Sequence, residues 1–92
     1  MPTKPLEEVE KDVDVLQQEP AKVILFNDDV HTFDEVIGQL IKALRCTQNK
    51  AETLAIEAHN NGKAMVYLGE LVRCMEISGV LEEIRLMTQI EV

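Results

Sequence analysis

Four side chains of this sequence are of the types that can bind a primary ammonium group: Asn27, Asp28, Asp29 and His59. An ammonium group has a positive charge and three N–H donors, so it needs several acceptors close together. Asn offers an amide oxygen, Asp a negative charge, and a neutral His one ring nitrogen. Plainer explanations stand beside this one, because Asn-Asp-Asp is typical of a turn and a histidine near a helix end is typical of a C-terminal cap.

The segments around these side chains must bring them together. Residues 21–26 contain the apolar run Val-Ile-Leu-Phe, which predicts a buried strand that ends at the Asn-Asp-Asp turn. Thr32 and Glu35 have the spacing of a capping box, which predicts a helix that begins near Phe33. The apolar residues of this helix follow a 3.6-residue period: Phe33, Val36, Ile37, Leu40, Ile41 and Leu44.

A second helix is predicted after the cap residue Thr47, with Gly62 at its end. Its buried face would consist of Ala51, Leu54, Ala55 and Ala58. Residues 63–67 then read as a strand. A third helix is predicted from Leu68, Leu71, Val72 and Met75, with its end at Ser78-Gly79, and a last strand from the alternation of Ile84, Leu86, Ile90 and Val92.

The resulting order is β-α-α-β-α-β, and it predicts an α+β fold in which three helices pack on one face of a three-stranded antiparallel sheet. Residues 21–92 form this core domain. Residues 1–20 contain six acidic residues and three prolines without a sustained apolar period, and they are expected to be a mobile acidic tail.

Composition excludes several classes of partner and site. The formal net charge is -8, which argues against nucleic acid and anionic membrane surfaces as partners. Cys46 and Cys74 form no Cys-x-x-Cys pair, and with only two histidines they give no zinc spacing. Reduced cysteines and the lack of a signal-like N-terminus predict a cytoplasmic protein. No metal and no cofactor are expected.

Two other classes of site remain open from the residues alone. An enzyme would use Asp28 or Asp29 with His59 as an acid/base pair, but the sequence has no phosphate loop, nucleophile elbow or metal quartet. A metal site could use the same three residues together with His31. These ligand types are suitable, but their spacing matches no known metal motif.

Three segments carry a resemblance to a known family. Residues 22–29 read KVILFNDD, residues 33–40 continue the match, and residues 51–63 end in HNNGK. Together they resemble ClpS, the bacterial adaptor of the N-end rule pathway, over most of the chain after residue 20. The family fold has the same order of strands and helices as the one predicted above.

The resemblance implies a non-enzymatic adaptor that captures proteins through a free α-amino group and a bulky hydrophobic N-terminal residue. It would act as a monomer and deliver them to the N-terminal domain of a Clp AAA+ unfoldase of the ClpA or ClpC type. By position, Asn27, Asp29 and His59 would bind the amino group, with assistance from Asp28. The hydrophobic pocket would be formed by Leu25, His31, Phe33, Val36, Ala55, Ala58 and Leu86, and the unfoldase interface would include Glu70 and Met75.

The sequence departs from the family pattern at the pocket and at the docking face. Many members read Asn-Asp-Asp-Tyr-Thr-Pro-Met, whereas this chain continues with residues 30–33, Val-His-Thr-Phe. Ala55 stands where Met is usual, and Met75 stands where many members have Lys. We expect Phe and Leu as first residues of the ligand, with Tyr and Trp as further candidates.

The departures keep a rival hypothesis open, namely a protein-interaction module that retains the fold and has lost the amino-group site. Residues 68–92 also resemble the C-terminal domain of the large-subunit ribosomal stalk protein, which shares this fold. That domain lacks the Asn-Asp-Asp turn and the histidine. The presence of Asn27, Asp29 and His59 therefore favours ligand binding.

Overall fold

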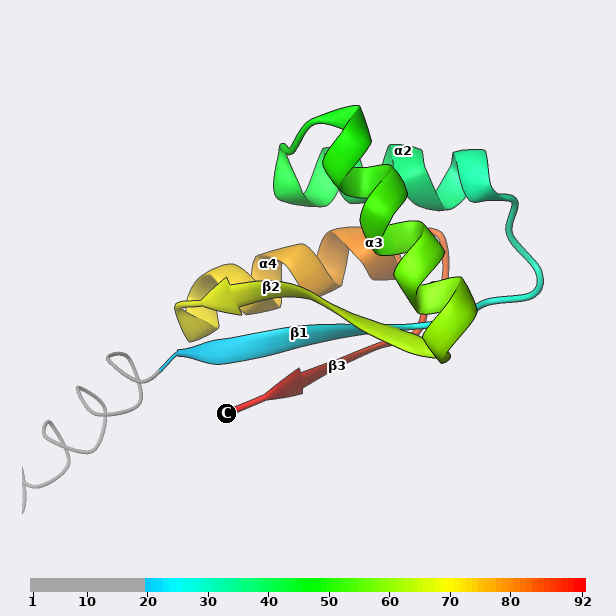
Figure 1. Ribbon diagram of the computed structural model, residues 1–92. Helices are drawn as coiled ribbons and strands as arrows, with labels where there is room; N and C mark the ends of the chain where they lie inside the picture. The colour runs from blue at the N-terminus through cyan, green and yellow to red at the C-terminus, as the bar shows by residue number, and fades with distance from the viewer. Residues whose placement is uncertain (1–19) are drawn as a thin grey trace, which may run out of the picture.

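The computed structural model describes residues 20–92 (Figure 1). Within them the chain forms, in order, β1 (Ala21–Phe26), α2 (Phe33–Leu44), α3 (Gln48–Asn61), β2 (Lys63–Gly69), α4 (Leu71–Glu82) and β3 (Thr88–Glu91). The predicted order and the α+β class are confirmed. The predicted acidic tail falls on residues 1–20 and, except for its last residue, lies outside the described residues.

The sheet has β1 at its centre, between β2 and β3, and both pairings are antiparallel. Along β1 the side chains of Val23 and Leu25 are fully buried, whereas that of Lys22 is exposed. Because side chains alternate between the two faces of a strand, Val23 and Leu25 face the helices. This burial explains why the apolar run of β1 can be recognised in the sequence.

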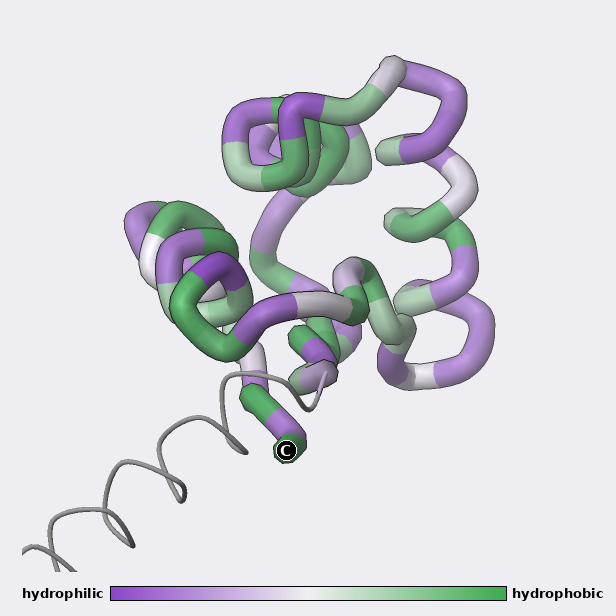
Figure 2. The backbone as a smooth tube through the Cα atoms, turned by 90° about the vertical axis from the view of Figure 1, so that its left-hand side faces the viewer, coloured by the Kyte–Doolittle hydropathy of each residue, from purple (hydrophilic) through white to green (hydrophobic). Residues whose placement is uncertain are grey.

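The helices lie on one side of the sheet. Helix α4 contacts all three strands, α3 packs against β2, and α2 packs on α3 and α4. Viewed at 90° to Figure 1, α2 and α4 appear one above the other, and α3 descends beside them toward the sheet (Figure 2). The core between these elements is apolar and includes Leu25, Leu40, Leu54, Ile77, Leu81 and Leu86.

Local signals fix the ends of α2 and α3. The Thr32 side chain accepts a hydrogen bond from the Glu35 backbone N–H, and the Glu35 carboxylate accepts one from the Thr32 backbone N–H. This reciprocal capping satisfies backbone donors that the helix leaves free. At the other end of α3, Gly62 adopts the left-handed conformation with φ 84°, which a glycine adopts without a side-chain clash.

The predicted third helix was wrong in both its bounds and its buried face. Leu68 belongs to β2, and α4 continues through Ser78 and Gly79 to Glu82. Its buried side chains are Cys74, Ile77, Ser78 and Leu81, whereas Val72 and Met75 are 60% and 59% exposed. Gly79 lies inside α4, and a Cβ at this position would meet no atom within 4 Å, so this glycine occupies an open helix position.

The predicted last strand began too early. Only Thr88–Glu91 pairs with β1, and the residues from Glu83 to Met87 connect α4 to it. Arg85 adopts a left-handed backbone with φ 66°, which is incompatible with an extended strand at that position. Leu86 is nevertheless buried, because the connection returns its side chain to the core.

Candidate functional site

Two backbone hydrogen bonds at the end of β1 bring distant segments together. The N–H of Asn27 donates to the carbonyl of Gly62 at 2.8 Å, which joins the Asn-Asp-Asp turn to the end of α3. The N–H of Phe26 donates to the carbonyl of Met87 at 3.0 Å, which brings the segment before β3 alongside. His59 and Leu86 are therefore held near the turn by main-chain contacts.

A cavity of about 220 Å³ lies at this junction. Most of its apolar lining belongs to the core, since Leu25, Ala55, Ala58 and Leu86 are at most 3% exposed. Sites for drug-sized ligands are usually larger, about 300–1,000 Å³. The complete lining is Leu25, Phe26, Asn27, Asp28, Asp29, His31, Thr32, Phe33, Val36, Ala55, Ala58, His59 and Leu86.

The structure thus places every residue predicted for the amino-group site and the hydrophobic pocket around one cavity. Sequence reasoning missed two lining residues, Phe26 and Thr32. Phe26 is the last residue of β1, directly beside the predicted turn, and Thr32 is predicted from the sequence only as a helix cap. Both residues are next to predicted site residues in the sequence, and this proximity could have predicted that they line the cavity.

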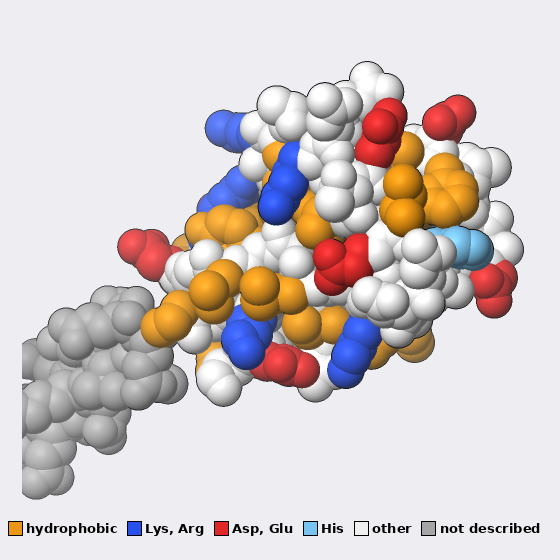
Figure 3. All heavy atoms as spheres, viewed as in Figure 1, with side chains coloured by type: hydrophobic (Ala, Val, Ile, Leu, Met, Phe, Trp, Pro, Cys, Tyr) orange, Lys and Arg blue, Asp and Glu red, His pale blue; other side chains and the backbone are white. Residues whose placement is uncertain are grey.

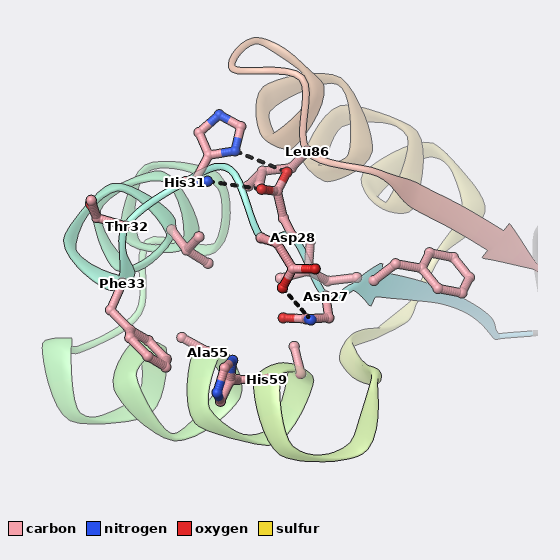
Figure 4. Close-up of a pocket in the computed structure, with 13 residues that line it drawn as sticks. Asn27, Asp28, His31, Thr32, Phe33, Ala55, His59 and Leu86 are labelled. Atoms are coloured by element: carbon pink, nitrogen blue, oxygen red, sulfur yellow. Dashed lines mark hydrogen bonds and ion pairs between the residues drawn. The ribbon is translucent and has the colours of Figure 1, made fainter.

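The polar side chains converge at the mouth of the cavity. The Asn27 amide nitrogen donates to the Asp29 carboxylate at 3.2 Å, which leaves the Asn27 carbonyl oxygen free to accept. In Figure 4 this carboxamide lies between the turn and α3, on the same side of the cavity as the His59 ring. The described residues that line the cavity include two aspartates and no Lys or Arg, so its potential favours a cation.

Asp28 interacts mainly with its own loop. One carboxylate oxygen accepts hydrogen bonds from the backbone N–H groups of Val30, at 2.6 Å, and His31, at 2.8 Å. The other lies 2.9 Å from Nδ1 of His31. The His31 backbone N–H, followed by that of Val30, holds the pKa of Asp28 below its usual value, because these donors stabilise the charged form.

The rings of Phe33 and His59 form an edge-to-face pair across the mouth of the cavity. Their centroids are 5.2 Å apart and their planes meet at 64°. Such pairs contribute about 0.5–1.5 kcal/mol beyond the burial of area. Phe33, which is 45% exposed, therefore orients the imidazole of His59 while it leaves part of its own ring available to a ligand.

The second predicted surface lies at the other end of the molecule. Figure 1 shows the start of α4 next to the start of β1, away from the loop that joins β1 to α2. Glu70 precedes α4, is exposed and makes no side-chain capping bond, and Met75 projects from the exposed face of the helix. On the face seen in Figure 3, apolar side chains gather at the left-hand end and also at the right-hand end, where a histidine lies beside them.

The alternative metal site finds no support in the described part of the chain. Within residues 20–92, no three His, Cys, Asp or Glu side chains are grouped so that they could hold a metal ion. Asp28 and His31 form a pair, but Asp29 instead accepts from Asn27. Over the same residues, no helix has both the length and the apolar character needed to cross a membrane.

Fold and site together define a small α+β domain with an apolar pocket that is edged by hydrogen-bond acceptors. Comparison with known proteins refines this class. Residues 16–88 match the family model described as "ATP-dependent Clp protease adaptor protein ClpS". The match covers most of the chain, and the protein therefore belongs to the ClpS family.

Individual relatives agree with this assignment. The chain is 39% identical over 51 residues to the ClpS adapter protein of Treponema denticola and 36% identical over 66 residues to that of Nautilia profundicola. These matches span 55% and 72% of this chain, and 50% and 66% of the relatives. The chain is also 38% identical over 58 residues to the E3 ubiquitin-protein ligase UBR2 of Homo sapiens. This match spans 63% of this chain and 3% of the ligase.

A solved structure has the same fold. It is Agrobacterium tumefaciens ClpS2 bound to L-phenylalaninamide, which matches with a TM-score of 0.74 and 23% sequence identity. The match covers 79% of this chain and 95% of that one. At this level of identity the likeness establishes the three-dimensional arrangement of the elements.

Proposed function

We propose that the protein captures other proteins by their N-termini and delivers them to a Clp AAA+ unfoldase for degradation. The observation that carries this proposal is the convergence of Asn27, Asp29 and His59 at the mouth of one apolar cavity. An N-terminal residue has the complementary chemistry, since its ammonium group and its side chain are separated by a single carbon. No bond is broken in this scheme, so the protein acts as an adaptor and not as an enzyme.

Each of the three acceptors has a distinct part in the proposed complex. The Asn27 carbonyl oxygen, the Asp29 carboxylate and the unprotonated nitrogen of a neutral His59 each accept one N–H of the ammonium group. Asp28 assists by its negative charge. It also holds the loop, because it accepts hydrogen bonds from two backbone N–H groups. The first side chain of the ligand fills the cavity between Leu25, Val36 and α3.

Simple energetics set an upper limit to the affinity near micromolar. Each charge-assisted hydrogen bond contributes about 1.5–3 kcal/mol, and the burial of one large side chain contributes about 1.5–3 kcal/mol. Association costs at least about 4 kcal/mol, so the best case is a net gain of about 8 kcal/mol, which corresponds to a dissociation constant near 1 μM. Acetylation of the amine removes its charge and two of its donors and should therefore weaken binding. This difference makes the site specific for a free α-amino group.

The pocket favours bulky first residues. Ala55 and Ala58 leave space along α3, and the half-exposed Phe33 ring offers an aromatic contact at the mouth. Phe and Leu are the preferred ligands, and Tyr and Trp are further candidates. The ligand bound to Agrobacterium tumefaciens ClpS2 is L-phenylalaninamide, which has a free amino group and a benzyl side chain.

Delivery uses the end of the molecule that includes Glu70 and Met75. These residues dock on the N-terminal domain of an unfoldase of the ClpA or ClpC type, in the cytoplasm, with the adaptor as a monomer. Both side chains are exposed, and the start of α4 lies away from the loop that joins β1 to α2, so one adaptor can hold substrate and unfoldase together. Cys46 and Cys74 are both free, in keeping with a reducing compartment.

The proposal is tested by titration of fluorescent peptides that begin with Phe, Leu, Tyr, Trp, Ile or Ser. Each peptide is used with a free and with an acetylated N-terminus, against the unmodified protein. We expect binding of the free Phe and Leu peptides near micromolar concentration and little binding of any acetylated peptide. Equal affinity for the free and acetylated Phe peptides would contradict the proposal and favour an interaction module without an amino-group site.

A further inference from the structure

A second histidine, His31, lies beside the proposed amino-group site without being one of its acceptors. Its side chain is 16% exposed, and its Nδ1 atom is buried. Among the described residues, the polar atom within reach of Nδ1 is Oδ2 of Asp28, at 2.9 Å, although the two are not aligned as in a full hydrogen bond. Figure 4 shows the imidazole on the far side of the turn from Phe33 and His59.

This contact constrains where the imidazole carries its proton. If Nδ1 had no hydrogen, two acceptor atoms would lie 2.9 Å apart in a buried place and would repel each other. A hydrogen on Nδ1 instead places a positive partial charge beside Oδ2, although the N–H bond is not aligned with that oxygen. The contact is therefore attractive when His31 is a neutral Nδ1–H tautomer and also when it is an imidazolium ion.

The same carboxylate organises the loop that follows Asn27. Its Oδ1 atom accepts hydrogen bonds from the backbone N–H groups of both Val30 and His31. Because Asp28 stands between Asn27 and Asp29 in the chain, a rotation of its backbone would move both of those acceptors. An Asp28 carboxylate that is held on one oxygen by the loop and on the other by the imidazole has little freedom to rotate.

We propose that His31 is a positioning residue, whose protonated Nδ1 attracts the Asp28 carboxylate and so presets Asn27 and Asp29 for the α-amino group of the ligand. This inference rests on the proposed function and deepens it. His31 stabilises the receptor geometry before the ligand arrives, which reduces the ordering that binding must otherwise supply. Its contribution depends on the charge and position of Asp28 and not on a hydrogen bond to the ligand.

Three substitutions separate this role from simple packing. His31→Asn places an amide nitrogen where Nδ1 stands and can donate to Asp28, whereas His31→Leu has similar bulk and no donor. His31→Gln keeps an amide but places it one bond further out. Affinity is measured by fluorescence anisotropy with a Phe-initiated peptide that has either a free or an acetylated N-terminus.

For the free-amine peptide we expect His31→Leu and His31→Gln to weaken binding by about 10-fold, and His31→Asn to recover most of that loss. The acetylated peptide, for which little binding is expected with any of these proteins, gives the background of the measurement. In an Asp28→Asn background, His31→Leu should have little further effect. Equal losses for Leu and Asn, or an undiminished loss in the Asp28→Asn background, would overturn the role of His31.

A readout without ligand distinguishes a failure of this inference from a failure of the proposed function. Hydrogen exchange of the Val30 and His31 backbone amides, followed by NMR, reports the loop directly. Exchange should be several-fold faster in His31→Leu than in His31→Asn. Unchanged exchange would refute the positioning role even if free amines are bound selectively. A different outcome is faster exchange in His31→Leu together with equal affinity for free and acetylated peptides. That outcome would refute the amino-group site but would support the contact between His31 and Asp28.

Discussion

The two ends of this molecule differ in how their residues are fixed. At the pocket end, main-chain hydrogen bonds from Phe26 and Asn27 join β1 to the segments that contain Leu86 and His59. At the α4 end, Glu70 makes no capping bond and Met75 extends into solvent. The position of the pocket is therefore fixed by main-chain contacts of the fold. In contrast, the exposed side chains of the proposed docking face can be substituted without a loss of core packing.

The largest expected effect falls on the pocket end. Asn27→Ala removes an acceptor for the ammonium group and the amide that donates to Asp29. We expect the affinity for a free Phe-initiated peptide to fall by about 10- to 100-fold, because one charge-assisted hydrogen bond is lost. Isothermal titration calorimetry measures the change. An affinity within about twofold of the original would remove Asn27 from the site.

The width of the pocket should set the preference among bulky residues. Ala55→Met adds a long side chain to a wall of the cavity and leaves the acceptors at its mouth in place. We expect a Trp-initiated peptide to lose about 5-fold in affinity relative to a Leu-initiated one, since extra volume in a packed site is costly. Competition between the two peptides tests this. An unchanged ratio would show that the Trp side chain does not reach α3.

The capping box links the pocket to folding stability. Thr32→Ala removes the acceptor for the Glu35 backbone N–H at the start of α2. We expect the free energy of unfolding to fall by about 1 kcal/mol, as for other threonine caps. Urea denaturation measures this, and Thr47→Ala at the start of α3 is a matched control that cuts a similar cap farther from the cavity. Only the Thr32 variant should also weaken peptide binding.

Acid should weaken the turn through Asp28. The pKa of this carboxyl is lowered below its usual 3.8, first of all by the His31 backbone N–H, so the ionised form stabilises the folded state. That contribution is present above about pH 4 and is lost as the pH falls through the lower pKa of the folded state. The stability difference between the unmodified protein and Asp28→Asn should therefore shrink from about pH 6 to about pH 3. A constant difference in urea denaturation would contradict this.

The smallest expected effect belongs to the α4 end. Met75→Lys introduces the residue that is common at this position in the family, at a side chain that is 59% exposed. Stability should change by less than about 0.5 kcal/mol, and peptide affinity should not change. Binding to the N-terminal domain of a ClpA- or ClpC-type unfoldase, measured by surface plasmon resonance, should change. A loss of peptide affinity would show that the two ends are coupled.

The sequence predicted the pocket end better than the α4 end for a physical reason. Thr32 with Glu35, Thr47 and Gly62 act over a few residues, so their effects can be inferred locally. The hydrophobic face of α4 is chosen by the sheet beneath it, and apolar residues occur on both of its faces. The pattern of Val72 and Met75 therefore resembles a buried stripe although both side chains are exposed.

The final strand illustrates the same limit. Ile84 and Leu86 fit an alternating pattern, but the left-handed backbone of Arg85 interrupts it. Ser78, Glu82 and Thr88 form a hydrogen-bonded group that fixes where β3 begins, and these contacts join residues up to 10 positions apart. The pairing of Asp28 with His31 was likewise not inferred, because Asx-type loop contacts depend on backbone geometry as well as spacing.

The most direct test of N-terminus capture is a crystal structure of this protein with L-phenylalaninamide. We expect the amino group to lie within hydrogen-bond distance of Asn27, Asp29 and His59, with the benzyl ring in the cavity between Leu25 and Ala55. A ligand whose amino group faces solvent, or whose ring lies outside the cavity, would contradict this mode of capture.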